Sequence, residues 1–183
     1  KAHESDVARL LTPMAKFWIC KRGSAFAQET MECLGGNGYV EEGGQGLMAR
    51  IYREMPLNSI WEGAGNIMGL DLLRGLRQCD ALACLQRELA PARGRHPAFD
   101  QAFEGLPLLL QELATPLQAR RLAQQLALLM QAGLLIQSAP PAVAQAFCDS
   151  RLAGHWGQAF GTLGAQTDLD AIVVRALPSA GVL

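Results

Sequence analysis

The chain has 183 residues, of which 50% are hydrophobic and 18% are charged, and its formal net charge is -1. This composition is typical of a folded globular protein and excludes an intrinsically disordered chain. A charge balance so close to zero gives no overall field that would draw the protein to nucleic acid or to an anionic membrane.

Cysteine and histidine usage predicts a reducing compartment and no metal centre. The five cysteines show no CxxC spacing, so we expect free thiols and a cytoplasmic protein. The three histidines are scattered along the chain without a second ligand at metal spacing, and no metal site is predicted. No uninterrupted apolar run reaches the roughly 18 residues of a membrane span, so no membrane association is predicted.

The first predicted elements are a long helix and a glycine-rich loop. Thr12-Pro13 is typical of a helix start, and the apolar residues that follow recur at helical intervals, which predicts a helix of about 22 residues that stops at Gly35 or Gly36. Residues 4–11 are expected to be the tail of a preceding helix. Six glycines within 35–46 predict a loop with unusual backbone angles.

Two further helices are predicted before residue 79. A short helix spans about 47–54, and Pro56 then leads into an extended segment over 57–61. The second is longer and runs from Gly63 to Gln78. Its predicted inward face consists of four apolar side chains: Ile67, Leu70, Leu73 and Leu76.

After Cys79 the chain is rich in Leu, Ala and Gln, and strand signals are nearly missing. Helices are predicted near 80–90, 98–113, 117–137, 142–153 and 168–177, separated by proline and glycine breaks. Apolar residues around much of the 117–137 helix predict a core position for it: Leu122, Leu126, Leu129, Met130 and Leu134. The predicted fold class is therefore all-α: a helical bundle over 1–79 with an additional α-helical extension over 80–183.

Two short motifs have both a functional and an ordinary structural interpretation. In Gly35-Gly36-Asn37-Gly38-Tyr39 the glycines would let backbone N–H groups approach a phosphate, but for the motif alone a glycine helix cap is the simpler explanation. Arg50-Ile51-Tyr52-Arg53 places two guanidinium groups on one helical face, where a solvated surface or a structural ion pair with Glu54 is the simpler interpretation.

The third motif is Trp61-Glu62-Gly63-Ala64, a carboxylate between a tryptophan and a glycine turn just ahead of an apolar helix. If Glu62 lies dry beside the indole, burial would make its carboxylate a stronger proton acceptor. The alternative is an ordinary acidic residue that stabilises the helix dipole.

The order and spacing of these three motifs strongly resemble the C-terminal helical domain of the acyl-CoA dehydrogenase family, over about residues 3–79. The resemblance implies FAD-dependent α,β-dehydrogenation of an acyl-CoA thioester, with Glu62 as the catalytic base that removes the α-proton. It further implies cofactor contacts from two segments. Gly35, Gly36 and Gly38 match a loop that touches the diphosphate of a neighbouring subunit's FAD, whereas Gly63 and Ala64 match the turn beside the flavin.

The resemblance to this family also implies binding partners: an acyl-CoA substrate, further copies of the same chain in a homo-oligomer, and an electron-transfer acceptor. The chain is expected to be a fragment that lacks the family's N-terminal helical domain and middle β-domain. On its own it should bind FAD poorly, turn over nothing and expose apolar helix faces.

The combination of Asn58-Ser59-Ile60-Trp61-Glu62-Gly63 with the helical extension over 80–183 resembles the AidB branch, a bacterial flavoprotein group tied to the adaptive response to DNA alkylation. This implies an alternative function: a flavoprotein with little dehydrogenase activity that acts through DNA or partner binding. Seven basic against eight acidic residues in the extension disfavour strong DNA binding, although Arg93 with Arg95 and Arg120 with Arg121 could form a small patch. A plain helical oligomerisation domain is the third possibility.

Overall fold

A computed structural model describes residues 2–41, 46–156 and 159–177, and every regular element within these ranges is helical. The predicted all-α fold class is confirmed. The chain forms two compact units, one from residues 1–84 with 107–127 and the other from residues 85–106 with 128–183. Each unit therefore combines two separate segments of the chain, and the boundaries between the units fall inside helices.

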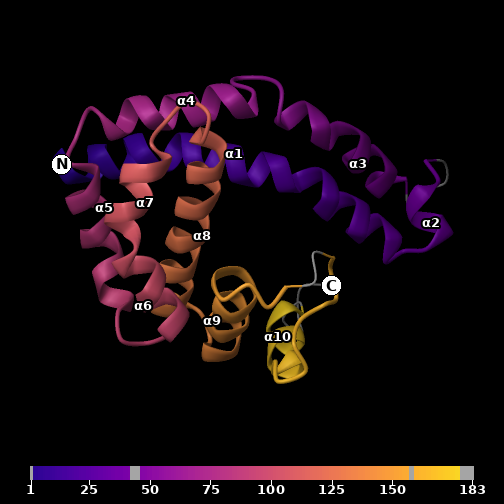
Figure 1. The fold of residues 1–183 in the computed structure, drawn as a ribbon. Helices are drawn as coiled ribbons and strands as arrows, with labels where there is room; N and C mark the ends of the chain where they lie inside the picture. The colour runs from indigo at the N-terminus through magenta and orange to yellow at the C-terminus, as the bar shows by residue number, and fades with distance from the viewer. Residues whose placement is uncertain (1, 42–45, 157–158, 178–183) are drawn as a thin grey trace. The chain divides into compact units, whose positions relative to one another are not determined.

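The first unit is built on a helical hairpin. α1 (Ala2–Glu32) leads through the short α2 (Gly36–Tyr39) into α3 (Leu47–Asn58) and α4 (Gly65–Leu76). Figure 1 shows α3 and α4 following one another back along α1, and α1 packs against both. The core between them contains Leu10, Met14, Phe17, Leu72 and Leu73, all buried.

The predicted helix start at Pro13 is wrong, because α1 runs without interruption from Ala2 to Glu32 with Pro13 inside it. A proline at this position removes the helical hydrogen bond to the carbonyl four residues earlier, that of Arg9. α4 approaches that carbonyl closely, since a Cβ on Gly75 would lie 3.2 Å from the Arg9 oxygen. Pro13 is itself buried, so tertiary packing holds the helix through the break.

The predicted extended segment over 57–61 is also wrong. α3 continues through Pro56 to Asn58, and the chain then tightens into turns in which the amides of Ser59 and Ile60 donate to the carbonyls of Pro56 and Leu57. The predicted glycine loop contains the helical turn Gly36–Tyr39, while residues 42–45 lie outside the described residues.

The second long helix is confirmed, and its predicted inward face is confirmed in part, since Leu73 is buried and Leu70 and Leu76 are half-buried. α4 spans Gly65–Leu76, and Leu72 and Leu73 are its buried leucines, whereas the predicted core residue Ile67 is 51% exposed. Three glycines complete the buried side of α4: Gly65, Gly69 and Gly75. α4 therefore packs through glycines, which bring backbones into close approach, as well as through apolar side chains.

One ion pair ties α1 to α4. Both guanidinium ends of Arg9 lie 2.9 Å from the two carboxylate oxygens of Asp71, and Arg9 Nε donates to Gln78 Oε1 at 3.0 Å. The hydrogen bond from Arg9 holds the pKa of Asp71 below its usual range, and the charge of the arginine acts in the same direction. Both side chains are about one-third exposed, so solvent screens part of the attraction.

Asp71→Asn is expected to destabilise the fold at neutral pH by about 1 kcal/mol, because it removes the charge from a two-pronged charge-assisted pair. Since the folded pKa of Asp71 is lowered, the wild-type advantage is complete above the ordinary aspartate pKa of 3.8 and declines as the pH falls through the lower folded value. Urea unfolding of both proteins at pH 7 and near pH 2.5 checks this. A stability difference that grows toward acid would contradict it.

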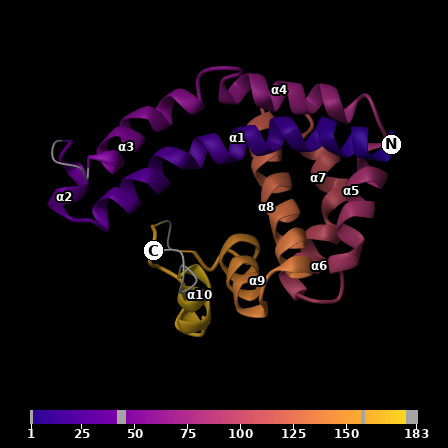
Figure 2. The same ribbon diagram turned by 180° about the vertical axis from the view of Figure 1, so that it is seen from behind.

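The second unit contains the remaining helices in the order that the sequence predicts. They are the end of α5 (Ala81–Leu89), the 3₁₀ turn η1 (Ala90–Ala92), α6 (Pro97–Glu104), the second half of α8 (Ala119–Ser138), α9 (Pro141–Phe147), the π-helical turn η2 (Cys148–Leu152) and α10 (Leu169–Ala176). Figure 2 shows α9 between α8 and α10. The predicted helix over 98–113 is divided at Gly105 into α6 and α7 (Leu106–Leu113), and all but the first residue of α7 belong to the first unit.

α8 occupies the predicted core position. Leu122, Leu126, Leu129 and Met130 are buried, whereas Leu134 is 57% exposed. Where α8 belongs to the second unit, a Cβ on Gly133 would lie 2.7 Å from Leu89 Cδ2, so a side chain there would require Leu89 to move.

All five cysteines are free thiols, of which Cys33 is exposed and Cys84 and Cys148 are buried. Burial raises the pKa of Cys148 to about 11, with a smaller contribution from the charge of Asp149, so this thiol is unreactive near neutrality. Across the part of the chain that the structure describes, no helix combines the length and apolarity needed to cross a membrane.

Candidate functional site

The turn that carries Glu62 joins α3 to α4 and has an unusual backbone. Glu62 has a φ of 52°, and it is the one non-glycine residue with positive φ among the residues described. Gly63 follows with a φ of 114°, a conformation that side chains rarely adopt, and Ala64 then returns to extended angles before α4 begins. Two consecutive left-handed residues thus lie in the turn that joins α3 to α4, which follow one another back along α1 (Figure 1).

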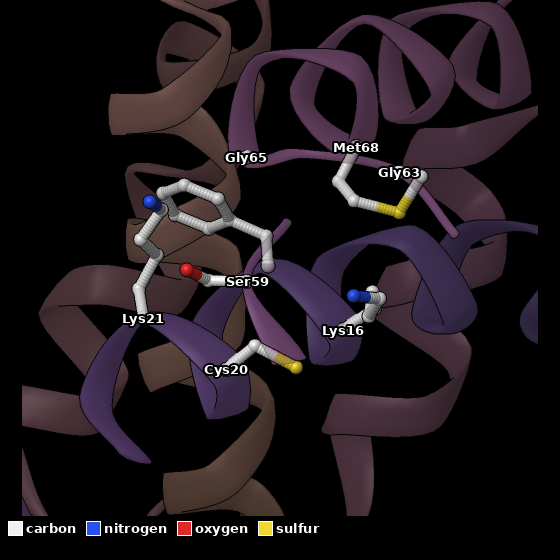
Figure 3. A pocket seen from close by; sticks show the side chains of 8 residues that line it. Lys16, Cys20, Lys21, Ser59, Gly63, Gly65 and Met68 are labelled. Carbon is white, nitrogen blue, oxygen red and sulfur yellow. The ribbon is translucent and has the colours of Figure 1, made fainter. Parts of the chain in front are cut away.

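α1 holds this turn from one side. Lys16 Nζ donates to the carbonyl oxygens of Asn58, at 2.5 Å, and Trp61, at 3.0 Å. At the start of α4 a Cβ on Gly65 would lie 2.7 Å from Lys21 Cε and 3.5 Å from the Phe17 ring. Figure 3 shows the small hollow between them, with Lys16, Cys20 and Lys21 on one side and Gly63, Gly65 and Met68 on the other.

The expectation that Glu62 lies dry beside Trp61 is wrong for the residues described. Glu62 is exposed, and the indole of Trp61 is also 54% exposed, so neither side chain excludes water from the other. The described residues therefore fix the backbone conformation of Glu62, but they do not shield its carboxylate from water. Its role as a base stays a prediction that requires a cover from elsewhere.

The glycine loop lies at the opposite end of α3 from the Glu62 turn (Figure 1). Gly35, with a φ of 60°, and Gly36 are exposed, and a Cβ on either would meet nothing within 4 Å. Gly38 is buried and packs so closely that a Cβ on it would collide with the Met31 carbonyl. Its amide donates to Gly35 O at 3.0 Å. Open backbone for a phosphate is thus found at Gly35 and Gly36, while Gly38 lets the loop close on α1.

The two arginines of the second motif make ordinary ion pairs. Arg50 Nε lies 3.4 Å from Glu54 Oε1 one helical turn away, and Arg53 pairs with Glu41. The predicted structural ion pair with Glu54 is confirmed. In the three described ranges there is no group of three or more His, Cys, Asp or Glu side chains that could hold a metal ion.

Lys16 is the residue at this turn that sequence reasoning missed. It lies more than forty residues before Glu62 in the sequence, so no local motif connects the two. The available signal is weak: a single lysine within the apolar run Met14-Ala15-Lys16-Phe17-Trp18, where a charge requires a partner.

Comparison with known proteins assigns the sequence to a family. Residues 1–77 match the family model of the acyl-CoA dehydrogenase C-terminal domain. The putative acyl-CoA dehydrogenase AidB of Escherichia coli (strain K12) is 45% identical over 152 residues, which are 82% of this chain and 27% of AidB. Acyl-CoA dehydrogenase family member 11 of Caenorhabditis elegans is 37% identical over 71 residues, which are 39% of this chain and 11% of that protein. The chain thus spans about a quarter of the length of AidB.

Solved structures share the fold. The crystal structure of Caenorhabditis elegans ACDH-11 in complex with C11-CoA superimposes with a TM-score of 0.73 over 95% of this chain and 34% of that chain, at 22% identity. The apo-form of Bd2924 superimposes with a TM-score of 0.56 over 84% of this chain and 27% of that chain, at 26% identity. At 22% identity the likeness to ACDH-11 shows the fold alone. Residues 1–77 thus match the C-terminal helical domain of the acyl-CoA dehydrogenase family, and the similarity to AidB extends beyond them.

Proposed function

We propose that this chain supplies the base and part of the flavin surroundings for α,β-dehydrogenation of an acyl-CoA thioester by a FAD-dependent protein. The observation that carries the proposal is the left-handed conformation of Glu62, which a residue with a side chain adopts at a cost. Strained residues persist where the surrounding structure imposes them, and they cluster at active sites. Here the strained residue is also the carboxylate of the family motif.

In the proposed reaction the Glu62 carboxylate accepts the α-proton of the thioester. An exposed carboxylate is a weak base, so a functional site needs further polypeptide to cover Glu62 and exclude water. AidB is almost four times as long as the part that this chain matches, which leaves ample sequence for an N-terminal helical domain and a middle β-domain. We propose that such domains complete the pocket, and that residues 80–183 form the extension beyond the family domain.

FAD fits the open glycine positions of the chain. Exposed backbone at Gly35 and Gly36 permits the close approach that a diphosphate requires, and the exposed Ala64 presents a small side chain beside Glu62, whereas the Met68 side chain lies against Gly63. FAD, when bound, accepts the hydride that leaves the β-carbon of the thioester. The two glycine segments stand at opposite ends of α3, and the family resemblance implies that they contact the flavins of different subunits in a homo-oligomer.

The described surface supports an oligomer or a further domain as partner. As expected from the sequence, the hairpin exposes large apolar side chains, among them Ile19, Tyr39, Val40, Leu47 and Ile60. Apolar side chains gathered along one hairpin are typical of a surface that another protein surface covers. We propose that this cover is a second copy of the protein together with its flavin-binding domains, and that an electron-transfer protein reoxidises the flavin.

The test is made on the longer protein of which this chain is expected to be a part, and it compares the FAD-loaded wild type with Glu62→Gln on straight and branched acyl-CoA thioesters, following the bleaching of the flavin. Bleaching by the wild type that is lost in the variant supports the proposal. Equal rates in both proteins remove Glu62 from the mechanism.

The similarity to AidB keeps a second function open: a flavoprotein with little dehydrogenase activity that acts in the alkylation-damage response through DNA or a partner. The arginines that could contact DNA are partly engaged. Arg93 lies over the Phe103 ring at 5.0 Å in the second unit, and Arg120 lies over the Phe17 ring at 5.6 Å in the first. This cation–π packing favours a structural role for one arginine of each pair, Arg93 and Arg120.

Binding to a 30-base-pair duplex is therefore expected to be weak and to depend little on salt. Few phosphate contacts release few counterions, so the slope of log K against log salt should be about -2 or shallower. Fluorescence anisotropy at several salt concentrations measures it. A steep slope that Arg95→Gln and Arg121→Gln make shallower would favour the DNA-binding function instead.

A further inference from the structure

Lys16 makes a contact that the family motif does not explain. It lies on α1 between the buried side chains of Met14 and Phe17, and its ammonium group reaches across to two carbonyls of the segment between α3 and α4. Both carbonyls lie within four residues of Glu62. Figure 3 shows Lys16 opposite Gly63 on the wall of the hollow.

The first carbonyl belongs to Asn58, the last residue of α3. Carbonyls at a helix end have no donor within the helix and carry the negative end of the macrodipole. An ammonium group 2.5 Å away supplies both a donor and a positive charge. Lys16 therefore fixes the point at which α3 stops.

The second carbonyl belongs to Trp61 and forms part of the peptide group that enters Glu62. The orientation of this peptide plane determines φ at Glu62, which is 52°. Without a restraint, a residue with a side chain relaxes to negative φ, because left-handed angles cost about 1 kcal/mol or more. On the other side of Glu62 the restraint is Gly63, whose φ of 114° a side chain would strain.

We infer that Lys16 is a positioning residue for Glu62: by holding the carbonyls of Asn58 and Trp61 it imposes the left-handed turn that aims the carboxylate. Its link to catalysis rests on the proposed function, whereas its effect on the turn does not. Both hydrogen bonds that the ammonium group makes to described residues go to backbone carbonyls, so it acts through Glu62 and takes no part in proton transfer.

Three variants separate this role from a general loss of charge. Lys16→Met keeps the length of the side chain and removes the donors. Lys16→Arg keeps donors and charge. Lys21→Met is the matched control, because it removes the same charge from the same side of the hollow, where Lys21 packs its methylenes against Gly65 and makes no hydrogen bond to the described residues of the turn.

Two measurements are made on the FAD-loaded form of the longer protein of which this chain is expected to be a part. Hydrogen exchange of the amides over 59–63 should be about tenfold faster in Lys16→Met, because two charge-assisted bonds to the turn are lost. Steady-state kinetics should show a fall of about a hundredfold in kcat with KM changed less than about twofold, since a displaced base costs turnover and leaves thioester binding intact. Lys16→Arg should restore most of both, and Lys21→Met should resemble the wild type.

Unchanged exchange over 59–63 in Lys16→Met overturns the inference, as does an unchanged kcat in a variant whose turn has loosened. Equal losses in Lys21→Met also overturn it, because they would show a charge effect alone. If the wild type itself fails to bleach its flavin with any thioester, the proposed function fails, and the exchange comparison still decides whether Lys16 holds the turn.

Discussion

Glu62→Gln is expected to slow thioester-dependent bleaching of the flavin by about a thousandfold, because a positioned general base contributes roughly 10² to 10⁴ to the rate of proton transfer. Glutamine has the same shape and the same left-handed strain as glutamate, so the turn should persist and FAD content should stay unchanged. Stopped-flow absorbance under single-turnover conditions measures the chemical step directly.

Two controls make the result specific. Glu112→Gln makes the same chemical change at an exposed position on α7 and should bleach at the wild-type rate. Glu62→Gly removes the carboxylate and also relieves the positive φ, so it should be inactive and yet slightly more stable than the wild type. A Glu62→Gly protein that keeps its bleaching rate would exclude the carboxylate from catalysis, whatever the effect of glutamine.

Leu72→Ala is expected to lower the free energy of unfolding by about 3 kcal/mol. Leu72 is fully buried between α1 and α4, and the removal of a buried leucine side chain costs both transfer free energy and the cavity it leaves. The loss should appear as a lower urea midpoint with an unchanged dependence on urea concentration.

Ile67→Ala is the matched control on the same helix. Its side chain is 51% exposed, so the loss should stay within about 0.5 kcal/mol. Comparable losses for both variants would mean that a partner surface covers Ile67 in solution, whereas a larger loss for Ile67→Ala would contradict the buried face of α4 described here.

Local sequence signals were sufficient for the type of nearly every element. Helical spacing of apolar residues and proline or glycine breaks predicted α4, α5, α8 and α10 close to their observed bounds, because these signals act over one or two helical turns, but they predicted α6 and α7 as a single helix. The same signals failed at Pro13 and Pro56. Each of these prolines removes one backbone hydrogen bond, and in α1 and α3 the helix continues through the loss.

The buried face of α4 illustrates a second limit. A pattern of large apolar residues selects Ile67, Leu70, Leu73 and Leu76, but the helix turns Gly65, Gly69 and Gly75 toward the core. Gly69 packs against Ala119 and Gly75 against the backbone of Arg9, and both neighbours are remote in sequence. Glycine carries no hydrophobic signal of its own, so only the approach of those neighbours determines which face is buried.

By itself, the sequence determined that the protein is all-α, where most of its helices begin and end, and that the motif of residues 61–64 immediately precedes a helix. Tertiary structure alone decided the left-handed angle at Glu62, the exposure of its carboxylate and the bond from Lys16 to the carbonyl of Trp61. Helix formation follows from interactions within a few residues, whereas the strain and surroundings of a side chain depend on groups that folding brings together from distant parts of the chain.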